Sequence, residues 1–232
     1  MSLLDAVKAA GLICGDEATQ AQKKRYSEML SAALAVELAD GLREVGFPKV
    51  RPVRGGPGEK AFQGGLGPKK VDVSYADEQH GLLLAVSVKS INVAPFGKNL
   101  KNRFSDLCTE AITLHLRFPY SVVCALFAFP EGADDDVTAG RKASTFQRAT
   151  KLFATISGRE EYTDPGEKFE NVTMMLVGPC RDGGEEPWLR LVDTVTGKEI
   201  SEEDYFQLLR RIFNERNPHA TVGEDDWQEE EE

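Results

Sequence analysis

An acid and a lysine on two neighbouring strands are the residues of this sequence whose types and spacing best suit chemistry. Asp72 lies in one alternating apolar run, and Ser87 and Lys89 lie in the next run, beyond a short polar turn. Two such runs around a turn that ends in glycine predict a β-hairpin. If the hairpin pairs Asp77 with Leu82, Asp72 falls opposite the serine, and Lys89 lies two residues further along the same face. A carboxylate and an ammonium held together on rigid strands suit the binding of a divalent metal ion and a phosphate.

This pairing divides the hairpin into a polar and an apolar face, because successive side chains of a strand point to opposite sides of the sheet. Ser74 joins Asp72, Ser87 and Lys89 on the polar face. The apolar face consists of Val71, Val73, Tyr75, Leu84, Val86 and Val88. The site is therefore expected on the polar face.

Asp72 and Lys89 have different expected roles. Metal-dependent hydrolysis of a phosphodiester needs hard oxygen ligands such as the Asp72 carboxylate, and the metal turns a bound water into the nucleophile. Lys89 would stabilise the negative charge that develops on the phosphate and orient or help deprotonate the water. A lysine in so apolar a strand needs a charged partner, and Asp72 is the nearest one. A purely structural Asp72–Lys89 ion pair is the alternative.

The run Pro68-Lys-Lys-Val-Asp72 followed by Ser87-Val-Lys89 resembles the signature of the PD-(D/E)XK, or restriction-endonuclease-like, nucleases. The resemblance covers roughly residues 20–130. It implies an α/β fold with a central mixed β-sheet of about five strands flanked by helices. It also implies a metal-dependent nuclease that hydrolyses DNA phosphodiester bonds, an endonuclease of restriction or phage-defence type. The expected cofactor is Mg²⁺, with Mn²⁺ as an alternative, and the expected partner is double-stranded DNA.

Ser87 departs from this signature, because the family usually has an acid or glutamine at its position. Two glutamates are candidates for the missing metal-binding carboxylate. Glu37 lies in the apolar stripe of a helix that precedes the sheet, where a buried carboxylate is costly unless it meets a cation or a metal. Glu110 lies on the flank of the helix after the hairpin, and relatives with serine in the triplet draw a carboxylate from that helix. Burial favours Glu37 as a catalytic and metal-binding residue, Glu110 is kept as the alternative metal ligand, and Ser87 is assigned a supporting role.

Basic residues gather in the sequence around the proposed site, although the chain carries a net charge of −10. Seven of the acids lie in residues 224–232, and without them the net charge is −3. A local surface that binds phosphates is therefore compatible with the overall charge. The residues assigned to it are Lys69, Lys70, Lys98, Lys101 and Arg103. Ordinary solvated lysines are the alternative interpretation.

The length and composition of the chain suit one α/β domain. At 232 residues it is long enough for a substantial core. Its four cysteines are scattered without paired spacing, so neither a structural zinc site nor a disulfide framework is expected. No apolar run reaches the length of a membrane span, and no signal peptide is expected at the N-terminus. A cytoplasmic protein follows from these features.

Hydrophobic periodicity predicts the remaining elements. Helices are expected over 20–45, 99–117 and 137–157, and a last helix is expected after Ser201 as its N-cap. Strands are expected over 49–54, 121–129, 171–177 and 188–192, with a glycine-rich loop over 55–68. The predicted organisation is an N-terminal arm or short helix over 1–19, a nuclease-like domain over 20–217 and a disordered acidic tail over 218–232.

Two other functions remain open at this point. The chain fits a non-catalytic DNA-binding or assembly subunit of the same fold, which Ser87 in place of an acid favours. It also fits a protein-interaction module, which the acidic balance favours. A homodimer is compatible with any of these functions.

Overall fold

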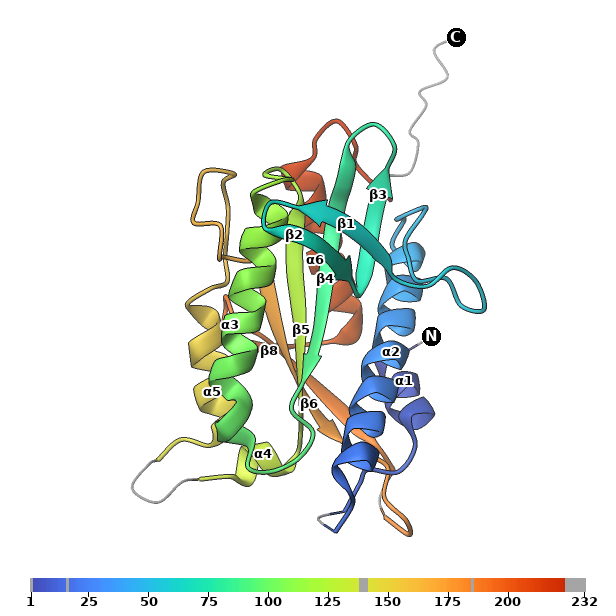
Figure 1. Ribbon diagram of the computed structural model, residues 1–232, viewed down its shortest axis with the longest axis vertical. Helices are drawn as coiled ribbons and strands as arrows, with labels where there is room; N and C mark the ends of the chain where they lie inside the picture. The colour runs from blue at the N-terminus through green and yellow to red at the C-terminus, as the bar shows by residue number, and fades with distance from the viewer. Residues whose placement is uncertain (1, 16, 138–141, 185, 224–232) are drawn as a thin grey trace.

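A six-stranded mixed β-sheet forms the centre of the protein in a computed structural model, which describes residues 2–15, 17–137, 142–184 and 186–223 (Figure 1). The strand order is β3-β4-β5-β6-β7-β8. The strands span β3 (Val73–Asp77), β4 (Gly81–Ser90), β5 (Val122–Pro130), β6 (Asn171–Gly178), β7 (Trp188–Asp193) and β8 (Lys198–Ile200). β5 pairs in parallel with β4 and β6, and the other pairs are antiparallel. The predicted α/β class with a mixed sheet is confirmed.

Helices cover both faces of this sheet (Figure 1). One face packs against α1 (Leu3–Ala10), α2 (Gln20–Glu44) and α6 (Glu202–Arg216), and the other packs against α3 (Phe96–His115) and α5 (Thr145–Ala154). A four-residue helix, α4 (Gly132–Asp135), follows β5. Because every side chain of β5 is buried between the two helical layers, its sequence is a continuous apolar run rather than an alternating one.

The long helix α2 follows its predicted bounds closely and packs tightly against α6. Its first turn is closed by a capping box between Thr19 and Gln22. Further along, Gly41 faces the ring of Phe206, and a Cβ at Gly41 would lie 2.2 Å from that ring. A glycine in mid-helix costs stability, but here it allows the two helices to approach closely. Ser201 caps α6 as predicted.

The N-terminal helix α1 is part of the same core. Leu3 and Val7 are fully buried in the cluster that includes α2 and α6. The carboxylate of Glu202 accepts hydrogen bonds from the Leu3 backbone amide at 2.6 Å and from Ser2 Oγ at 2.9 Å. The predicted short helix is therefore present, and contacts to the first turn of α6 hold it in place.

The largest difference from the sequence-based expectation lies in the glycine-rich stretch. Instead of a loop over 55–68, the chain forms a separate two-stranded sheet from β1 (Lys60–Gly64) and β2 (Gly67–Val71). The hairpin lies over α3, where the Gly65 backbone amide donates to the Thr113 carbonyl at 2.8 Å (Figure 1). The strand expected over 49–54 is reduced to a single bridge between Arg51 and Ser74.

Two further expectations concern the second half of the chain. The helix expected over 137–157 is shorter in the structure, with α5 at Thr145–Ala154, and positions 138–141 lie outside the described residues. Most of the predicted acidic tail, positions 224–232, lies outside them too. None of the helices in the described ranges combines the length and the apolar character needed to cross a membrane.

The central strand β5 gives a test of the core. We expect Leu126→Ala to lower the free energy of unfolding by about 2–5 kcal/mol, because Leu126 is fully buried and its removal leaves a cavity. Leu12→Ala is the matched control, since Leu12 is 59% exposed and should change stability little. Urea unfolding followed by circular dichroism measures both, and similar midpoints for the two variants would contradict this packing.

Candidate functional site

Asp72 lies at the bend between β2 and β3, next to the strand that carries the serine and the lysine. Its Oδ2 atom accepts a hydrogen bond from the Val88 backbone amide at 2.8 Å and lies 3.2 Å from Lys89 Nζ. The pairing of Val73 with Val86, continued by one residue, sets Asp72 opposite Ser87 as predicted. The structure therefore brings Asp72, Ser87 and Lys89 together.

The register of the hairpin differs from the prediction near its turn. Asp77 pairs with Gly81 rather than with Leu82, and an irregularity between Tyr75 and Ala76 restores the expected pairing further along. Val71 is also a correction. It was assigned to the apolar face with Val73, but it packs in the opposite cluster against α3, because the chain bends at Asp72.

Glu110 is the second carboxylate of the site. It follows Leu107 and precedes Ala111 and Leu114 on the buried stripe of α3, so the helical period aims it at the sheet. Its Oε1 atom accepts a hydrogen bond from Ser87 Oγ, and its Oε2 atom lies 3.4 Å from Lys89 Nζ. Glu110 is 1% exposed. A glutamate of α3 thus lies beside the serine and the lysine of β4.

A second lysine completes the cluster. The alternation of side chains along β2 directs Lys69 inward, and its Nζ atom lies 2.6 Å from Glu110 Oε2. The sequence assigned Lys69 to the surface that contacts nucleic acid, and its contact with the glutamate was not predicted, because β2 itself was missed. We call Lys69, Asp72, Ser87, Lys89 and Glu110 the Asp72–Glu110 site.

The charges of this site stabilise one another. Burial raises the pKa of the Glu110 carboxyl, but Lys89 and Lys69 outweigh that effect and hold the pKa below its ordinary value. Burial likewise lowers the pKa of the Lys89 ammonium, but the carboxylates of Glu110 and Asp72 together outweigh it and raise the pKa. At neutral pH the site therefore holds a charged Glu110 carboxylate and a protonated Lys89.

Glu37, the preferred second carboxylate in the sequence, lies elsewhere. It is 7% exposed, as expected for a buried acid, but its Oε1 atom pairs with Arg54 at 2.7 Å. Arg54 also pairs with Asp40 at 2.7 Å. Glu37 lies on α2, which packs against the sheet face opposite α3, whereas Ser87 and Lys89 reach the helix α3. The structure thus brings Glu110, and not Glu37, to the strand serine and lysine.

The other basic residues assigned to nucleic acid lie on α3 and β2. Lys98, Lys101 and Arg103 are exposed in the first turns of α3, and Arg103 pairs with Asp106 at 3.2 Å. Lys70 points outward from β2 and pairs with Glu59. These side chains lie on the two elements that supply Lys69 and Glu110, and Lys98 and Lys101 precede Glu110 by roughly 14–18 Å along α3.

A second buried charge cluster lies at the other end of α3. Glu170 pairs with Arg159 at 2.7 Å, lies 3.6 Å from His115 Nε2 and accepts a hydrogen bond from the Val123 backbone amide. Burial raises the pKa of the Glu170 carboxyl, but His115, Val123 and Arg159 outweigh this and lower it. His115 Nδ1 also lies 2.9 Å from the Gly166 carbonyl. The cluster ties α3 to the sheet and has the character of a structural network.

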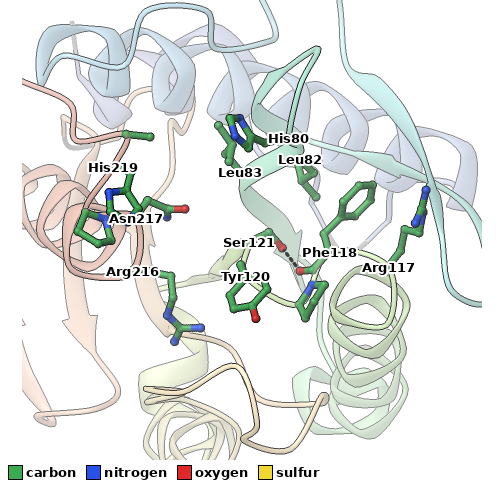
Figure 2. Close-up of a pocket in the computed structure, with 13 residues that line it drawn as sticks. His80, Leu82, Leu83, Arg117, Phe118, Tyr120, Ser121, Arg216, Asn217 and His219 are labelled. Carbon is green, nitrogen blue, oxygen red and sulfur yellow. Dashed lines mark hydrogen bonds between the residues drawn. The ribbon is translucent and has the colours of Figure 1, made fainter.

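A pocket of about 410 Å³ opens between the start of β4, the turn before β5 and the end of α6. Figure 2 shows Leu82, Tyr120 and Asn217 among its lining residues. No acid lines it among the described residues, and Leu82 lies roughly 23 Å along β4 from Lys89. The pocket therefore contributes no group to the Asp72–Glu110 site.

The Asp72–Glu110 site suits one kind of cofactor. Its two carboxylates are hard oxygen ligands, and Mg²⁺ is usually bound through one or two carboxylates together with substrate phosphates and waters. Within the described ranges, no group of three or more His, Cys, Asp or Glu side chains is arranged to hold a metal ion. Two carboxylates are fewer ligands than a closed structural site uses, so a hard divalent ion bound here would need further ligands from water or a substrate.

The buried charges predict a specific pH dependence of stability. We expect Glu110→Gln to lower the free energy of unfolding at pH 7 by about 3 kcal/mol, because two lysines lose a buried partner. The pKa of Glu110 is lowered from 4.5, so its stabilising effect is present above that pH and is lost as the pH falls through the folded-state pKa. The gap between the two proteins should therefore shrink below pH 4.5. Urea unfolding across this range measures it, with Glu59→Gln at a more exposed ion pair as control, and a constant gap would contradict the assignment.

Comparison with family models, with curated proteins and with solved structures found no match to this chain. The residues of the Asp72–Glu110 site and the elements that position them are therefore the basis for assigning a function. The most informative of them is Glu110 of α3, which lies beside the serine and the lysine of β4.

Proposed function

We propose that this chain is a divalent-metal-dependent nuclease that hydrolyses phosphodiester bonds of double-stranded DNA. The observation that carries the proposal is the position of Glu110, which reaches from α3 to the strand residues Ser87 and Lys89. Two carboxylates and a lysine then share one site, as the resemblance to the PD-(D/E)XK nucleases requires. In this proposal Glu110 would supply from α3 the carboxylate that Ser87 does not provide.

Asp72 and Glu110 are the residues that would hold Mg²⁺, or Mn²⁺ in its place. When bound, such an ion polarises the phosphate and lowers the pKa of a water that becomes the nucleophile. Lys89 acts as a cation in this proposal, because its pKa is raised and it keeps its proton at neutral pH. It would stabilise the charge that develops on the phosphate in the transition state.

Two supporting groups position the carboxylates. The Ser87 hydroxyl donates to one oxygen of Glu110, which leaves the other oxygen for a cation. The Val88 backbone amide donates to Asp72 and fixes this carboxylate against β4. Because both donors belong to β4, the two acids keep a constant relation to Lys89 on the same strand.

The basic residues of α3 and β2 suit a polyanionic substrate. Lys98 and Lys101 are exposed on α3, and Lys70 is exposed on β2. Contacts from such side chains to phosphates position a duplex without reading its sequence. They also make affinity depend strongly on salt concentration. An endonuclease of restriction or phage-defence type is the corresponding biological role, and a homodimer would suit cleavage of both strands.

A non-catalytic DNA-binding or assembly subunit of the same fold is the second candidate. It is favoured by the balanced charge of the site, where Lys69 and Lys89 neutralise the two carboxylates. A protein-interaction module is a third candidate. Incubation of the protein with duplex DNA in Mg²⁺, Mn²⁺ or EDTA separates them, since cleavage requires an enzyme and a salt-sensitive gel shift without cleavage indicates a binder.

We expect Asp72→Asn and Lys89→Met each to lower the rate of plasmid cleavage at least about 100-fold, because each removes a charge that acts on the reacting phosphate. Lys8→Met on α1, far from the site in the sequence, should cleave at the wild-type rate and serves as control. Gel electrophoresis of the products measures the rates, and thermal melting shows that the variants are folded. Wild-type cleavage by either folded site variant would rule out this catalytic set.

The two glutamates give a sharper comparison. We expect Glu110→Gln to abolish Mg²⁺-dependent cleavage and Glu37→Gln to retain it, because Glu110 contacts Lys89 whereas Glu37 pairs with Arg54. Both substitutions remove one buried negative charge, so each controls for the other. Cleavage rates measured over a range of Mg²⁺ concentrations decide the matter. The reverse result would assign the second carboxylate to α2.

A further inference from the structure

Lys69 holds a position that the proposed chemistry does not use. Its ammonium lies 2.6 Å from Glu110 Oε2, closer than the 3.4 Å that separates this oxygen from Lys89 Nζ. The oxygen in question is the one that Ser87 leaves for a cation. Lys69 therefore occupies the face of Glu110 where a metal ion would bind.

The net charge of the site determines how the contact between Lys69 and Glu110 affects metal binding. The two carboxylates of Asp72 and Glu110 are balanced by the two ammonium groups of Lys69 and Lys89. A divalent ion added to this arrangement would leave two uncompensated positive charges in a largely buried site. Because like charges repel strongly where water is excluded, one ammonium must leave before the ion binds well.

The Lys69 ammonium can leave the site at a lower cost in free energy than the Lys89 ammonium. Its side chain is 31% exposed and contacts one carboxylate of the site, on a flexible four-carbon stem. The Lys89 side chain is 19% exposed and lies within 3.2 Å of Asp72 and 3.4 Å of Glu110. Movement of Lys69 costs one contact near the surface, whereas movement of Lys89 costs two contacts in the interior.

We propose that Lys69 is a displaceable counter-ion that excludes divalent metal from Glu110 until its side chain swings out of the site. The displaced ammonium needs a new anionic partner, and a phosphate of the bound DNA is the partner that the proposed function supplies. This inference rests on the proposed function for the identity of the metal and of the anion. Metal binding in the absence of DNA is therefore weak, and the residue that weakens it is Lys69.

The experiment measures Mn²⁺ binding to the full-length protein without DNA by isothermal titration calorimetry at pH 7.5. We expect Lys69→Met to bind Mn²⁺ about tenfold more tightly than wild type, a difference of about 1.4 kcal/mol. Lys8→Met is the control, because Lys8 is an exposed lysine of α1, which packs on the sheet face opposite α3. Its Mn²⁺ affinity should equal that of wild type. Lys69→Gln, which keeps a hydrogen-bond donor without the charge, should resemble Lys69→Met and replaces it if the methionine variant fails to fold.

The outcomes separate this inference from the proposed function. Equal or weaker Mn²⁺ binding by the folded Lys69 variant overturns the counter-ion role, and so does the absence of binding in every protein up to 10 mM, which is about the highest practical concentration. Plasmid cleavage by wild type in Mg²⁺ is scored independently. Cleavage by wild type without a change in Mn²⁺ affinity in the Lys69 variant would support the nuclease function and refute the counter-ion role. Tighter Mn²⁺ binding by the variant without cleavage by wild type would support the counter-ion role and refute the nuclease function.

Discussion

The buried carboxylate of Glu110 is the constraint on which the Asp72–Glu110 site depends. A charge with 1% exposure is tolerated only where cations and hydrogen-bond donors surround it, and Lys69, Lys89 and Ser87 meet this need. These partners come from β2 and β4, so Glu110 on α3 fixes the relation of three elements at once. The separate hairpin β1–β2 is held over α3 in part by this ion pair. Stability and proposed chemistry therefore draw on the same contacts.

The arrangement of the sheet around β4 allows the charged residues of the Asp72–Glu110 site to gather on one face of that strand. β4 is the strand where an antiparallel edge, β3, meets the parallel pair with β5, and helices cover both of its faces. Its apolar residues Val86 and Val88 face α2, and Ser87 between them faces α3. The alternation of one strand thus separates a dry packing face from a polar face. Asp72 reaches that polar face because the chain bends just before β3.

Hydrophobic periodicity in the sequence predicts much of this arrangement. The hairpin β1–β2 and the choice between Glu37 and Glu110 could not be predicted in this way. The helical stripe of α2, the continuous apolar run of β5 and the cap at Ser201 predicted their elements well. The glycines of residues 55–68 favoured a loop, since they carry no side chains that reveal a strand. In the structure, Glu37 and Glu110 both occupy inward positions of a helical stripe. Periodicity placed Glu37 within its stripe and Glu110 only on the flank of its helix. It does not show which face of the sheet each helix covers, and the choice between the two glutamates depends on that.

All five residues of the Asp72–Glu110 site lie within a single stretch of 42 positions, from Lys69 to Glu110. The longest loop that must close to assemble the site is correspondingly short, and the entropy of closing a loop rises with its length. The strands β6–β8 and the helices α5 and α6 supply no member of the site, although they complete the core around it. Substitutions at the surface of that second half therefore change no residue of the charged cluster. The fold confines the charged cluster to one continuous stretch of the chain.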